Sequence, residues 1–318
     1  PDQLDDVYNQ IEGSFVGLGI ELKSTDKSLL IVKVIPNGPA HRAGIVAGDK
    51  ITAVNGKPTS DVSTDKAADM LKGEQGTYVD VTVLRGDSLR SLQVRRERVD
   101  VPGVEDIGII DQQNKIGYFR LTSFQKTTSR DVDRALWQLH REGMRSLIVD
   151  VRGNPGGLLP ASVEVADKFV QEGTLVSTRG RSPREDFDYK AHRVGTWRVP
   201  LIVLIDRDTA SASEIFAGAI HDHNRGTIVG ERSYGKGSVQ GIFPLSISRA
   251  GVRLTTAKFY SPSGQAISEQ GVKPHRTVHV MAKPVANQVQ PAGVPTEQSD
   301  PVVAAACEAA RQLTVAAK

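Results

Sequence analysis

The sequence of 318 residues lacks several features that would place it in a specialised class of protein. It holds a single cysteine, Cys307, which excludes an internal disulfide framework and a cysteine-rich zinc site. Forty Lys and Arg residues against 37 Asp and Glu leave a formal charge of only +3, which argues against a nucleic-acid partner. No apolar run approaches the roughly 20 residues that span a bilayer. These absences leave an ordinary globular chain, whose length suggests about two domains.

Residues 15–98 are expected to form a β-rich module. Apolar or alternating runs recur there at 29–34, 51–54 and 79–84, accompanied by Asn-Gly and Arg-Gly turn signals. One helix is expected near Asp65–Leu71, where apolar side chains recur at i, i+3 and i+4. Strands therefore predominate in this module.

From about residue 105 the pattern changes to strands and helices in alternation. Apolar runs predict strands at 116–121, 146–151 and 200–205, and amphipathic spacing predicts helices at 129–142, 160–171 and 213–223. Strands separated by helices of this length indicate an α/β layer with a largely parallel sheet. Sheet-like segments return at 238–245 and 252–260.

Composition sets the remaining boundaries. The polar stretch 181–198 is expected to be a long surface loop, and the stretch 283–301, with its four prolines, an extended linker. An Ala-rich helix is expected at 302–318. We therefore divide the chain into a short N-terminal segment, the β-rich module, the α/β core, and a linker with a helical tail (1–14, 15–98, 99–282 and 283–318).

Two motifs resemble a nucleotide or metal site, but neither has the residues or the spacing that such a site needs. The run Gly230–Lys236 nearly matches a phosphate-binding loop, but Gly237 stands where that loop needs Ser or Thr, and an extended segment follows instead of a helix. His221 and His223 are two positions apart on a predicted helix and face different ways, so they cannot chelate one metal. We expect no metal and no cofactor.

Ser211 stands between a buried strand and the helix at 213–223. Ser211-x-x-Glu214 matches a capping box, which is a purely structural explanation for both residues. A serine at a helix N-terminus is also suited to act as a nucleophile, because free N–H groups and the helix dipole stabilise an oxyanion there. The fragment alone favours capping.

Lys236 shifts the balance towards catalysis. The helix carries the chain away from Ser211, and the next strand can return it over a similar distance, which would bring Lys236 beside the serine. The flanking glycines indicate close packing of the backbone around this lysine, and Gln240 at i+4 of an extended segment could orient it. A lysine base must be neutral, which requires desolvation worth roughly 4–5 kcal/mol.

The glycine-rich run Arg152–Gly157 directly follows a buried strand. It is a turn that uses glycine for positive φ angles. It could also present the Gly157 N–H as one arm of an oxyanion hole, with the Ala212 N–H as the other.

Taken together, these motifs resemble a known family. Phe15–Ile20, Gly38–Gly44 and Gly48–Gly56 resemble a PDZ domain. Arg152–Gly157, Thr209–Glu214, Gly235–Gln240 and Phe259–Gly264 resemble the carboxy-terminal processing (tail-specific) proteases, in the same order along about residues 12–280. The resemblance implies an α/β core similar to the crotonase and ClpP-like folds, with an inserted PDZ domain.

The resemblance also implies roles for individual residues. By motif, Ser211 rather than Ser213 is the nucleophile, Lys236 is the general base and Gln240 orients it. Gly157 and Ala212 match the oxyanion-hole positions. Asp222 matches an acidic position with a supporting role.

The implied partners are protein or peptide substrates with apolar C-termini. The terminal carboxylate would meet the N–H groups of Leu18, Gly19 and Ile20 as the substrate adds a strand to the PDZ domain. The resemblance allows membrane-associated substrates and a homo-oligomer. It implies an extracytoplasmic location (periplasm, lumen or cell surface), although the sequence, which begins at Pro1, displays no signal peptide.

The leading hypothesis is therefore a serine endopeptidase whose PDZ domain controls access to a Ser–Lys site. The alternative is a PDZ adaptor fused to an inert enzyme-like core. An acyl-CoA enzyme on the same type of core would require a CoA site that the sequence does not display.

Overall fold

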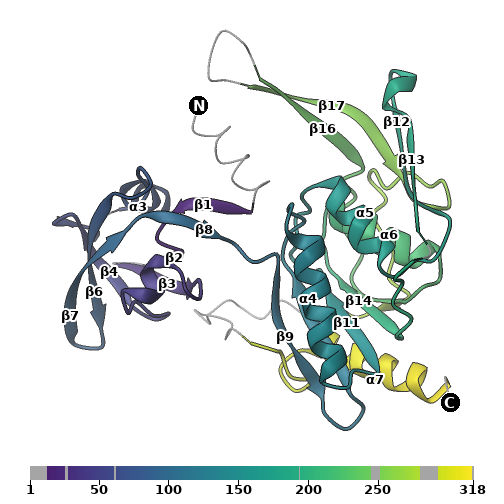
Figure 1. Ribbon diagram of the computed structural model, residues 1–318, viewed down its shortest axis with the longest axis horizontal. Coiled ribbons are helices and arrows are strands. Elements are labelled where there is room, and N and C mark those ends of the chain that lie inside the picture. The colour runs from purple at the N-terminus through teal and green to yellow at the C-terminus, as the bar shows by residue number, and fades with distance from the viewer. Residues whose placement is uncertain are drawn as a thin grey trace. The chain divides into compact units, whose positions relative to one another are not determined.

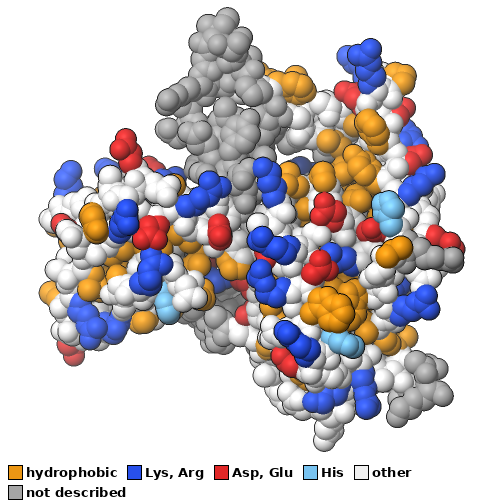
Figure 2. All heavy atoms as spheres, in the orientation of Figure 1, with side chains coloured by type: hydrophobic (Ala, Val, Ile, Leu, Met, Phe, Trp, Pro, Cys, Tyr) orange, Lys and Arg blue, Asp and Glu red, His pale blue; other side chains and the backbone are white. Residues whose placement is uncertain are grey.

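The computed structural model describes residues 13–25, 28–60, 62–192, 194–244, 251–279 and 293–316. These residues form two compact units (Figure 1). The β-rich unit spans Ser14–Val101, and the core unit is built from the chain that follows Pro102. On the face drawn in Figure 2, basic and acidic side chains are interspersed over both units, as the nearly balanced composition predicts.

The β-rich unit is organised around one antiparallel sheet with the order β2-β3-β4-β6-β7. Its buried core includes Leu29, Ile31, Ile51 and Val81. The segments are β2 (Ile20–Thr25), β3 (Ser28–Val34), α2 (Pro39–Arg42), β4 (Lys50–Val54), β5 (Lys57–Pro58), α3 (Thr64–Leu71), β6 (Tyr78–Arg85) and β7 (Ser88–Arg95). A separate pair of strands, β1 (Ser14–Gly17) and β8 (Glu97–Asp100), runs antiparallel. The expected single helix is α3, and α2 is a further short one.

The core unit contains a six-stranded sheet with the order β18-β15-β14-β11-β10-β9. Its strands are β9 (Val104–Asp111), β10 (Ile116–Leu121), β11 (Ser146–Asp150), β14 (Leu201–Ile205), β15 (Thr227–Gly230) and β18 (Arg276–Thr277). All neighbouring pairs are parallel except β9 with β10. The expected α/β layer with a largely parallel sheet is thus present.

Both faces of this sheet are covered, which explains why β11 and β14 are apolar throughout. On β14, Leu201, Val203 and Ile205 pack with α4 (Thr128–Arg141), α5 (Leu159–Asp167) and α6 (Ala212–Asp222). Ile202 and Leu204 point to the other face and pack with α7 (Pro301–Ala316). Figure 1 shows α7 in yellow, apart from the other three helices.

The helix α7 was expected from the sequence, but as part of a tail separate from the core. It packs into the core unit through fully buried Val303, Ala306 and Ala310, which contact β11, β14 and β15. Residues 293–316 thus lie in the same compact unit as the parallel sheet. The expected linker lies mostly outside the described residues, from 280 to 292.

A second sheet of the core unit, with the order β13-β12-β17-β16, is antiparallel. It consists of β12 (Thr174–Gly180), β13 (Phe187–Lys190), β16 (Ser238–Pro244) and β17 (Gly251–Tyr260). The sequence predicted a long loop at 181–198, and this prediction is wrong. The stretch contains the 3-10 turn Pro183–Glu185 and the edge strand β13. Most of β13 is exposed, so the strand carries no apolar pattern for the sequence to reveal.

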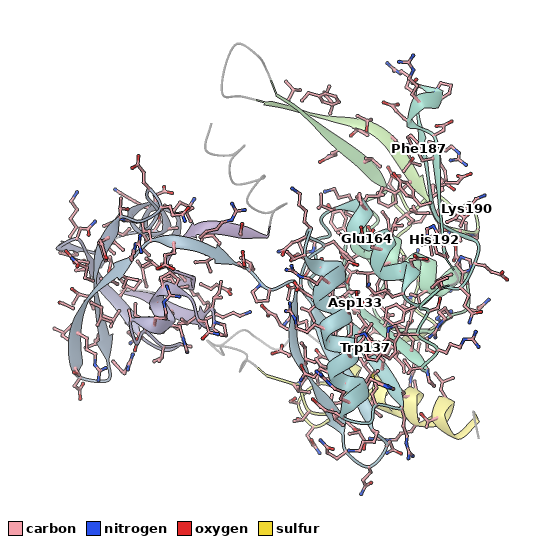
Figure 3. The ribbon with its side chains drawn as sticks, viewed as in Figure 1. Asp133, Trp137, Glu164, Phe187, Lys190 and His192 are labelled. Atoms are coloured by element: carbon pink, nitrogen blue, oxygen red, sulfur yellow. The ribbon has the colours of Figure 1, made fainter. Side chains whose placement is uncertain are left out.

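The outer face of α4 carries an exposed aromatic contact (Figure 3). Trp137 is 57% exposed and meets the ring of Trp197 edge-on at 5.2 Å. On the same helix, Asp133 pairs with Lys168 at 2.8 Å. The aromatic contact fastens the chain that precedes β14 to α4, and the ion pair joins α4 to the end of α5.

Candidate active site

Three loops meet at the carboxyl ends of neighbouring parallel strands. The run Arg152–Gly157 follows β11, the run Asp206–Ser211 follows β14, and the run Glu231–Gly237 follows β15. Because β11, β14 and β15 are adjacent and parallel, their carboxyl ends lie at one edge of the sheet. This is where open α/β sheets place their binding sites.

Ser211 is the N-cap of α6 and has a strained backbone, with φ of +58° and ψ of −118°. A non-glycine residue with positive φ costs free energy, and such residues cluster at functional sites. The preceding residue is fixed, since the Ala210 N–H donates to the Asn154 carbonyl oxygen at 3.0 Å. The Ser213 hydroxyl donates to the same oxygen at 3.0 Å. Ser213 is thus a buried anchor for the neighbouring loop.

The glycine loop lies directly against Ser211. A Cβ atom added to Gly156 would lie 2.8 Å from the Ser211 Cβ and 2.9 Å from the Ala212 nitrogen. A Cβ on Gly157, whose φ is +138°, would lie 2.1 Å from the carbonyl oxygen of Phe124. Only glycine fits at either position, and the structure brings Gly157 and Ala212, the two predicted oxyanion-hole residues, to one place.

A short parallel bridge with Phe124 sets the orientation of Gly157. The Phe124 N–H donates to the Gly156 carbonyl at 2.9 Å, and the Leu158 N–H donates to the Phe124 carbonyl at 2.7 Å. In this pattern the N–H of the middle residue points away from the partner strand. The Gly157 N–H is therefore not used in this bridge.

Lys236 is brought to Ser211 through Glu214, a fully buried residue in the first turn of α6. The Ser211 N–H donates to Glu214 Oε2 at 2.9 Å, and the Lys236 N–H donates to the same oxygen at 2.8 Å. The backbone N–H groups of the two predicted catalytic residues, which are distant in the sequence, thus meet at one carboxylate oxygen. The contact with Ser211 is also one half of the predicted capping box.

The backbone around Lys236 is tightly packed, as the flanking glycines predict. A Cβ on Gly237 would lie 2.1 Å from the Ser268 nitrogen, and one on Gly235 would lie 3.1 Å from the Glu269 carbonyl carbon. The Glu269 N–H donates to the Gly235 carbonyl at 2.8 Å. Lys236 itself is partly buried.

Gln240 is not joined to Lys236 by any hydrogen bond among the described residues. It lies on β16 with an exposed side chain, beside a β-bulge between Val239 and Gln240. Val239 lies opposite Ala257 and Gln240 opposite Thr255, so the extra residue of the bulge, Thr256, lies on the partner strand β17. Lys236 precedes β16, which begins at Ser238, so strand alternation alone does not relate its side chain to that of Gln240. The orienting role of Gln240 stays a prediction.

Asp222 lies at the opposite end of α6 from Ser211. Its carboxylate accepts hydrogen bonds from His221 at 2.8 Å and from the Ser263 N–H at 3.0 Å. Burial raises the pKa of Asp222, but hydrogen bonds from Ser261, Ser263 and His221 outweigh that effect and hold it below its usual range. Its observed contacts fix the turn that follows β17.

The predicted carboxylate-binding residues of the β-rich unit precede or begin its edge strand β2. Leu18 is buried, and its carbonyl accepts the Ala40 N–H at 2.9 Å, while the Gly19 carbonyl accepts the Ile35 N–H at 2.8 Å. Gly19 has a φ of +75°. Ile20 starts β2, whose outer edge is unpaired within the sheet and lies beside α3, so a peptide could add there.

The motifs rejected as cofactor sites have other structural explanations. The segment after Lys236 is the strand β16, not a helix. His221 stacks on His275 at 4.4 Å, whereas His223 pairs with the Thr174 carbonyl. The described residues contain no group of three or more His, Cys, Asp or Glu residues that could hold a metal ion.

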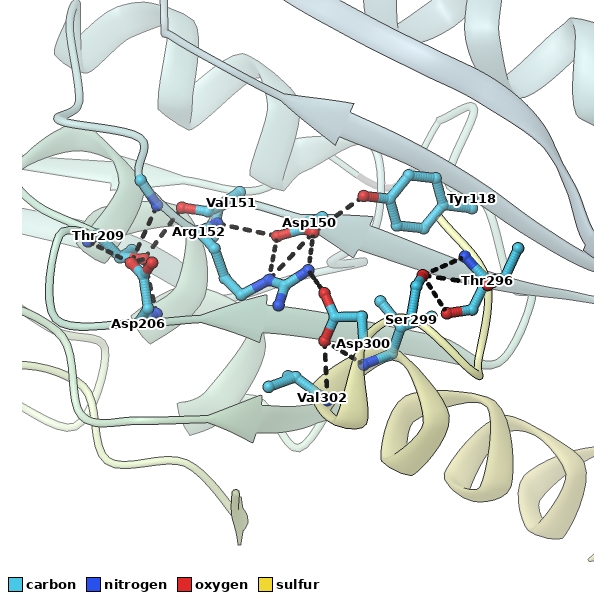
Figure 4. Close-up of polar contacts among 12 residues, drawn as sticks. Tyr118, Asp150, Val151, Arg152, Asp206, Thr209, Thr296, Ser299, Asp300 and Val302 are labelled. Carbon is cyan, nitrogen blue, oxygen red and sulfur yellow. Dashed lines mark hydrogen bonds and ion pairs between the residues drawn. The ribbon is translucent and has the colours of Figure 1, made fainter. Parts of the chain in front are cut away.

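A second polar cluster surrounds Arg152, the first residue of the glycine loop Arg152–Gly157 (Figure 4). Arg152 pairs with Asp150 at 2.6 Å and with Asp300, just before α7, at 2.8 Å. The Tyr118 hydroxyl donates to Asp150 at 2.9 Å. Burial raises the pKa of Asp300, but hydrogen bonds and the charge of Arg152 outweigh it and hold the pKa below its usual range. The cluster joins the first residue of the glycine loop to the C-terminal helix.

The sequence did not single out Glu214, Asn154 or Ser233 as members of the site. Glu214 was seen only as a helix cap. The signal that could have found it is chemical, because an acidic residue without a basic neighbour in an otherwise apolar helix needs other partners when buried.

The fold and these loops define a class: an α/β core with a site built from loops, joined to a small β-rich module. A family model described as peptidase family S41 matches residues 115–278, and one described as a PDZ domain matches residues 9–84. The chain belongs to peptidase family S41 and carries a PDZ domain.

Named relatives agree with this assignment. The chain is 37% identical to the carboxy-terminal-processing protease of Bartonella bacilliformis over 281 residues, covering 86% of this chain and 63% of the relative. It is 34% identical to the carboxyl-terminal-processing protease of a Picosynechococcus species, covering 87% and 68%. The chain thus spans about two thirds of these relatives.

Solved structures also resemble the chain. A photosystem II D1 C-terminal processing protease is 33% identical, with a TM-score of 0.52, and the match covers 87% of this chain and 76% of that one. An S41 protease from Bacteroides fragilis, 17% identical, shares the fold with a TM-score of 0.58 over 83% and 76%. Within the described part of the chain, no helix is both long and apolar enough to cross a membrane.

Proposed function

We propose that this protein is a serine endopeptidase that processes or degrades protein substrates with apolar C-termini. Ser211 is the nucleophile and Lys236 the general base. The observation that carries the proposal is the meeting of the Ser211 and Lys236 backbones at one oxygen of Glu214. An inert adaptor would not need this arrangement, and the names of the relatives favour a protease.

The proposed reaction assigns one role to each of these groups. Lys236, as a neutral amine, takes the proton of the Ser211 hydroxyl while Ser211 Oγ attacks the scissile carbonyl carbon. The N–H groups of Gly157 and Ala212 stabilise the negative oxygen of the tetrahedral intermediate. The C–N bond then breaks as Lys236 returns the proton to the leaving amine. Water hydrolyses the resulting ester and frees Ser211.

The PDZ domain supplies recognition. An apolar C-terminal segment adds as a strand to β2, with its carboxylate at the N–H groups of Leu18, Gly19 and Ile20. The homology implies an extracytoplasmic location and a core related to the crotonase and ClpP-like folds. The orienting role of Gln240 and the supporting role of Asp222 belong to the same proposal, as does control of access by the PDZ domain.

Cleavage of an unfolded protein with an apolar C-terminus tests the chemistry. Ser211→Ala and Lys236→Ala should each lower the rate by at least about a thousandfold, because members of a catalytic unit are each indispensable. The controls Ser88→Ala and Lys258→Ala, which change exposed side chains, should retain cleavage. Full activity in either catalytic variant would rule out the Ser–Lys assignment.

The same assay separates the protease from the adaptor. A substrate pair that differs only in a free or an amidated C-terminus should be cleaved unequally, with the free acid preferred. Binding of the free acid without any cleavage by the unmodified protein would favour the adaptor.

A further inference from the structure

Glu214 makes more hydrogen bonds than a helix cap requires. Besides the N–H groups of Ser211 and Lys236 on Oε2, its Oε1 accepts from the Ser233 hydroxyl at 2.6 Å and the Gly235 N–H at 2.6 Å. Its side chain belongs to a residue with 0% exposure. Two loops that carry the predicted nucleophile and base therefore share one carboxylate.

The partners of Glu214 are all neutral. None of the ion pairs among the described residues involves this carboxylate, and its four bonds come from three backbone N–H groups and a hydroxyl. A buried carboxylate without a cation is costly unless hydrogen bonds satisfy it. Four donors to two oxygens do so, and the first turn of α6 adds the favourable end of the helix dipole.

The loop Ser233–Lys236, which carries the predicted base, is also held by contacts other than those with Glu214. The Ser233 hydroxyl, which donates to Glu214, accepts the Val272 N–H at 2.7 Å. The Tyr234 N–H donates to the Thr209 carbonyl at 3.0 Å. Glu214 is thus the central acceptor of a network in which the Ser233–Lys236 backbone has little freedom to shift relative to Ser211.

We propose that Glu214 is a positioning residue that sets the distance between Ser211 and Lys236. This inference rests on the proposed function, because it assigns Glu214 to the geometry of that Ser–Lys pair. The carboxylate acts on the reaction through the two backbones it holds and does not exchange protons with the substrate. A displacement of about 1 Å between reacting groups can cost on the order of a hundredfold in rate.

A helix cap alone would predict a different outcome. Loss of a cap lowers the stability of the fold and leaves the chemistry of the folded enzyme unchanged. The chain offers a matched control, because Ser182 and Glu185 form a capping box at the 3-10 turn on the β12–β13 connection. The Ser182 N–H donates to Glu185 Oε2 at 3.3 Å.

Two substitutions probe Glu214 in different ways. Glu214→Gln keeps the length but puts an NH2 group against at least one N–H donor, whichever way the amide is turned. Glu214→Asp keeps the charge but withdraws the carboxylate by one methylene, so it cannot reach both loops. Glu185→Gln is the control in the same full-length protein.

The experiment measures kcat and KM for a peptide, the rate of labelling by a fluorophosphonate, and the melting temperature. We expect Glu214→Gln to lower kcat and the labelling rate by about tenfold, and Glu214→Asp by on the order of a hundredfold, with KM changed less than about twofold. Glu185→Gln should lower neither rate. Should a Glu214 variant fail to fold, the other one decides.

Two results would overturn the inference. One is a normal kcat and labelling rate in a folded Glu214→Asp or Glu214→Gln protein, which would leave Glu214 a structural cap. The other is an increase in KM with an unchanged kcat. Failure of the proposed function itself is seen separately, as full cleavage and labelling by Ser211→Ala, whatever the Glu214 variants do.

Discussion

Two buried polar clusters lie close to the glycine loop, and they are built on opposite principles. The Glu214 cluster satisfies one carboxylate with neutral donors and contains no ion pair among the described residues. The Arg152 cluster neutralises a guanidinium with two carboxylates. The first joins two loops of the site to each other, whereas the second joins a loop to α7 on the other face of the sheet.

The difference shows how one sheet edge separates catalysis from stability. Directional bonds from backbone N–H groups fix atoms to fractions of an ångström, which suits a reacting pair. Ion pairs at Arg152 hold a helix in place and tolerate small shifts, but each charge depends on its partner. Variants near Glu214 should therefore change rates, and variants near Arg152 should change stability.

Among the variants that contrast the two sides of this comparison, Gly157→Ala on the catalytic side should have the largest effect. The new Cβ would collide with the Phe124 carbonyl, so the backbone must move and carry the Gly157 N–H away from the oxyanion. Loss of one oxyanion-hole donor lowers kcat by about a hundredfold to a thousandfold. Gly143→Ala is the control, because Gly143 also has a positive φ but a Cβ added there would meet no atom within 4 Å. Equal kcat values for the two variants in peptide hydrolysis would contradict this prediction.

Arg152→Met tests the stabilising side. It leaves the buried Asp150 and the partly buried Asp300 without their cation, which should lower the free energy of unfolding by about 3 kcal/mol. Arg130→Met, which removes a 3.9 Å pair on the exposed face of α4, should cost less than about 1 kcal/mol. Denaturant titration of both proteins provides the comparison. Similar losses in the two would show that the Arg152 cluster adds no special stability.

The smallest effect is a dependence on pH. Because the pKa of Asp300 is lowered in the folded protein, its contribution to stability is present above its unfolded pKa of about 4. It is lost as the pH falls through the lower folded pKa. Asp300→Asn should therefore lower the melting temperature at pH 6, and the difference from the unmodified protein should shrink below about pH 4. A gap that widens in acid would have the wrong sign.

The regular elements could be predicted because their patterns are local. The helices α4 and α6 and the strands β10, β11 and β14 lie within a residue or two of the predicted ranges, since period and apolar content identify them. The edge strand β13 was not predicted, because its exposed side chains form no apolar pattern. The helix α7 was predicted, but its docking was not, since small apolar residues do not reveal which surface they cover.

The site residues also divide into those that a local pattern predicts and those that depend on tertiary contacts. Ser211, Lys236 and Gly157 were predicted from motifs and from the returning path of the chain, and their roles stay predictions. Glu214 was seen only in its contact with Ser211, because its bonds to Ser233, Gly235 and Lys236 depend on how a distant loop returns. The role of Gln240 was argued from strand alternation, but the strand begins only at Ser238, after Lys236.

The most direct test of the account is to map the adduct of a fluorophosphonate by mass spectrometry on the full-length protein. The account predicts one covalent adduct on Ser211, formed together with loss of cleavage, and little adduct in Lys236→Ala. An adduct on Ser213, or full cleavage without any modification of Ser211, would contradict it.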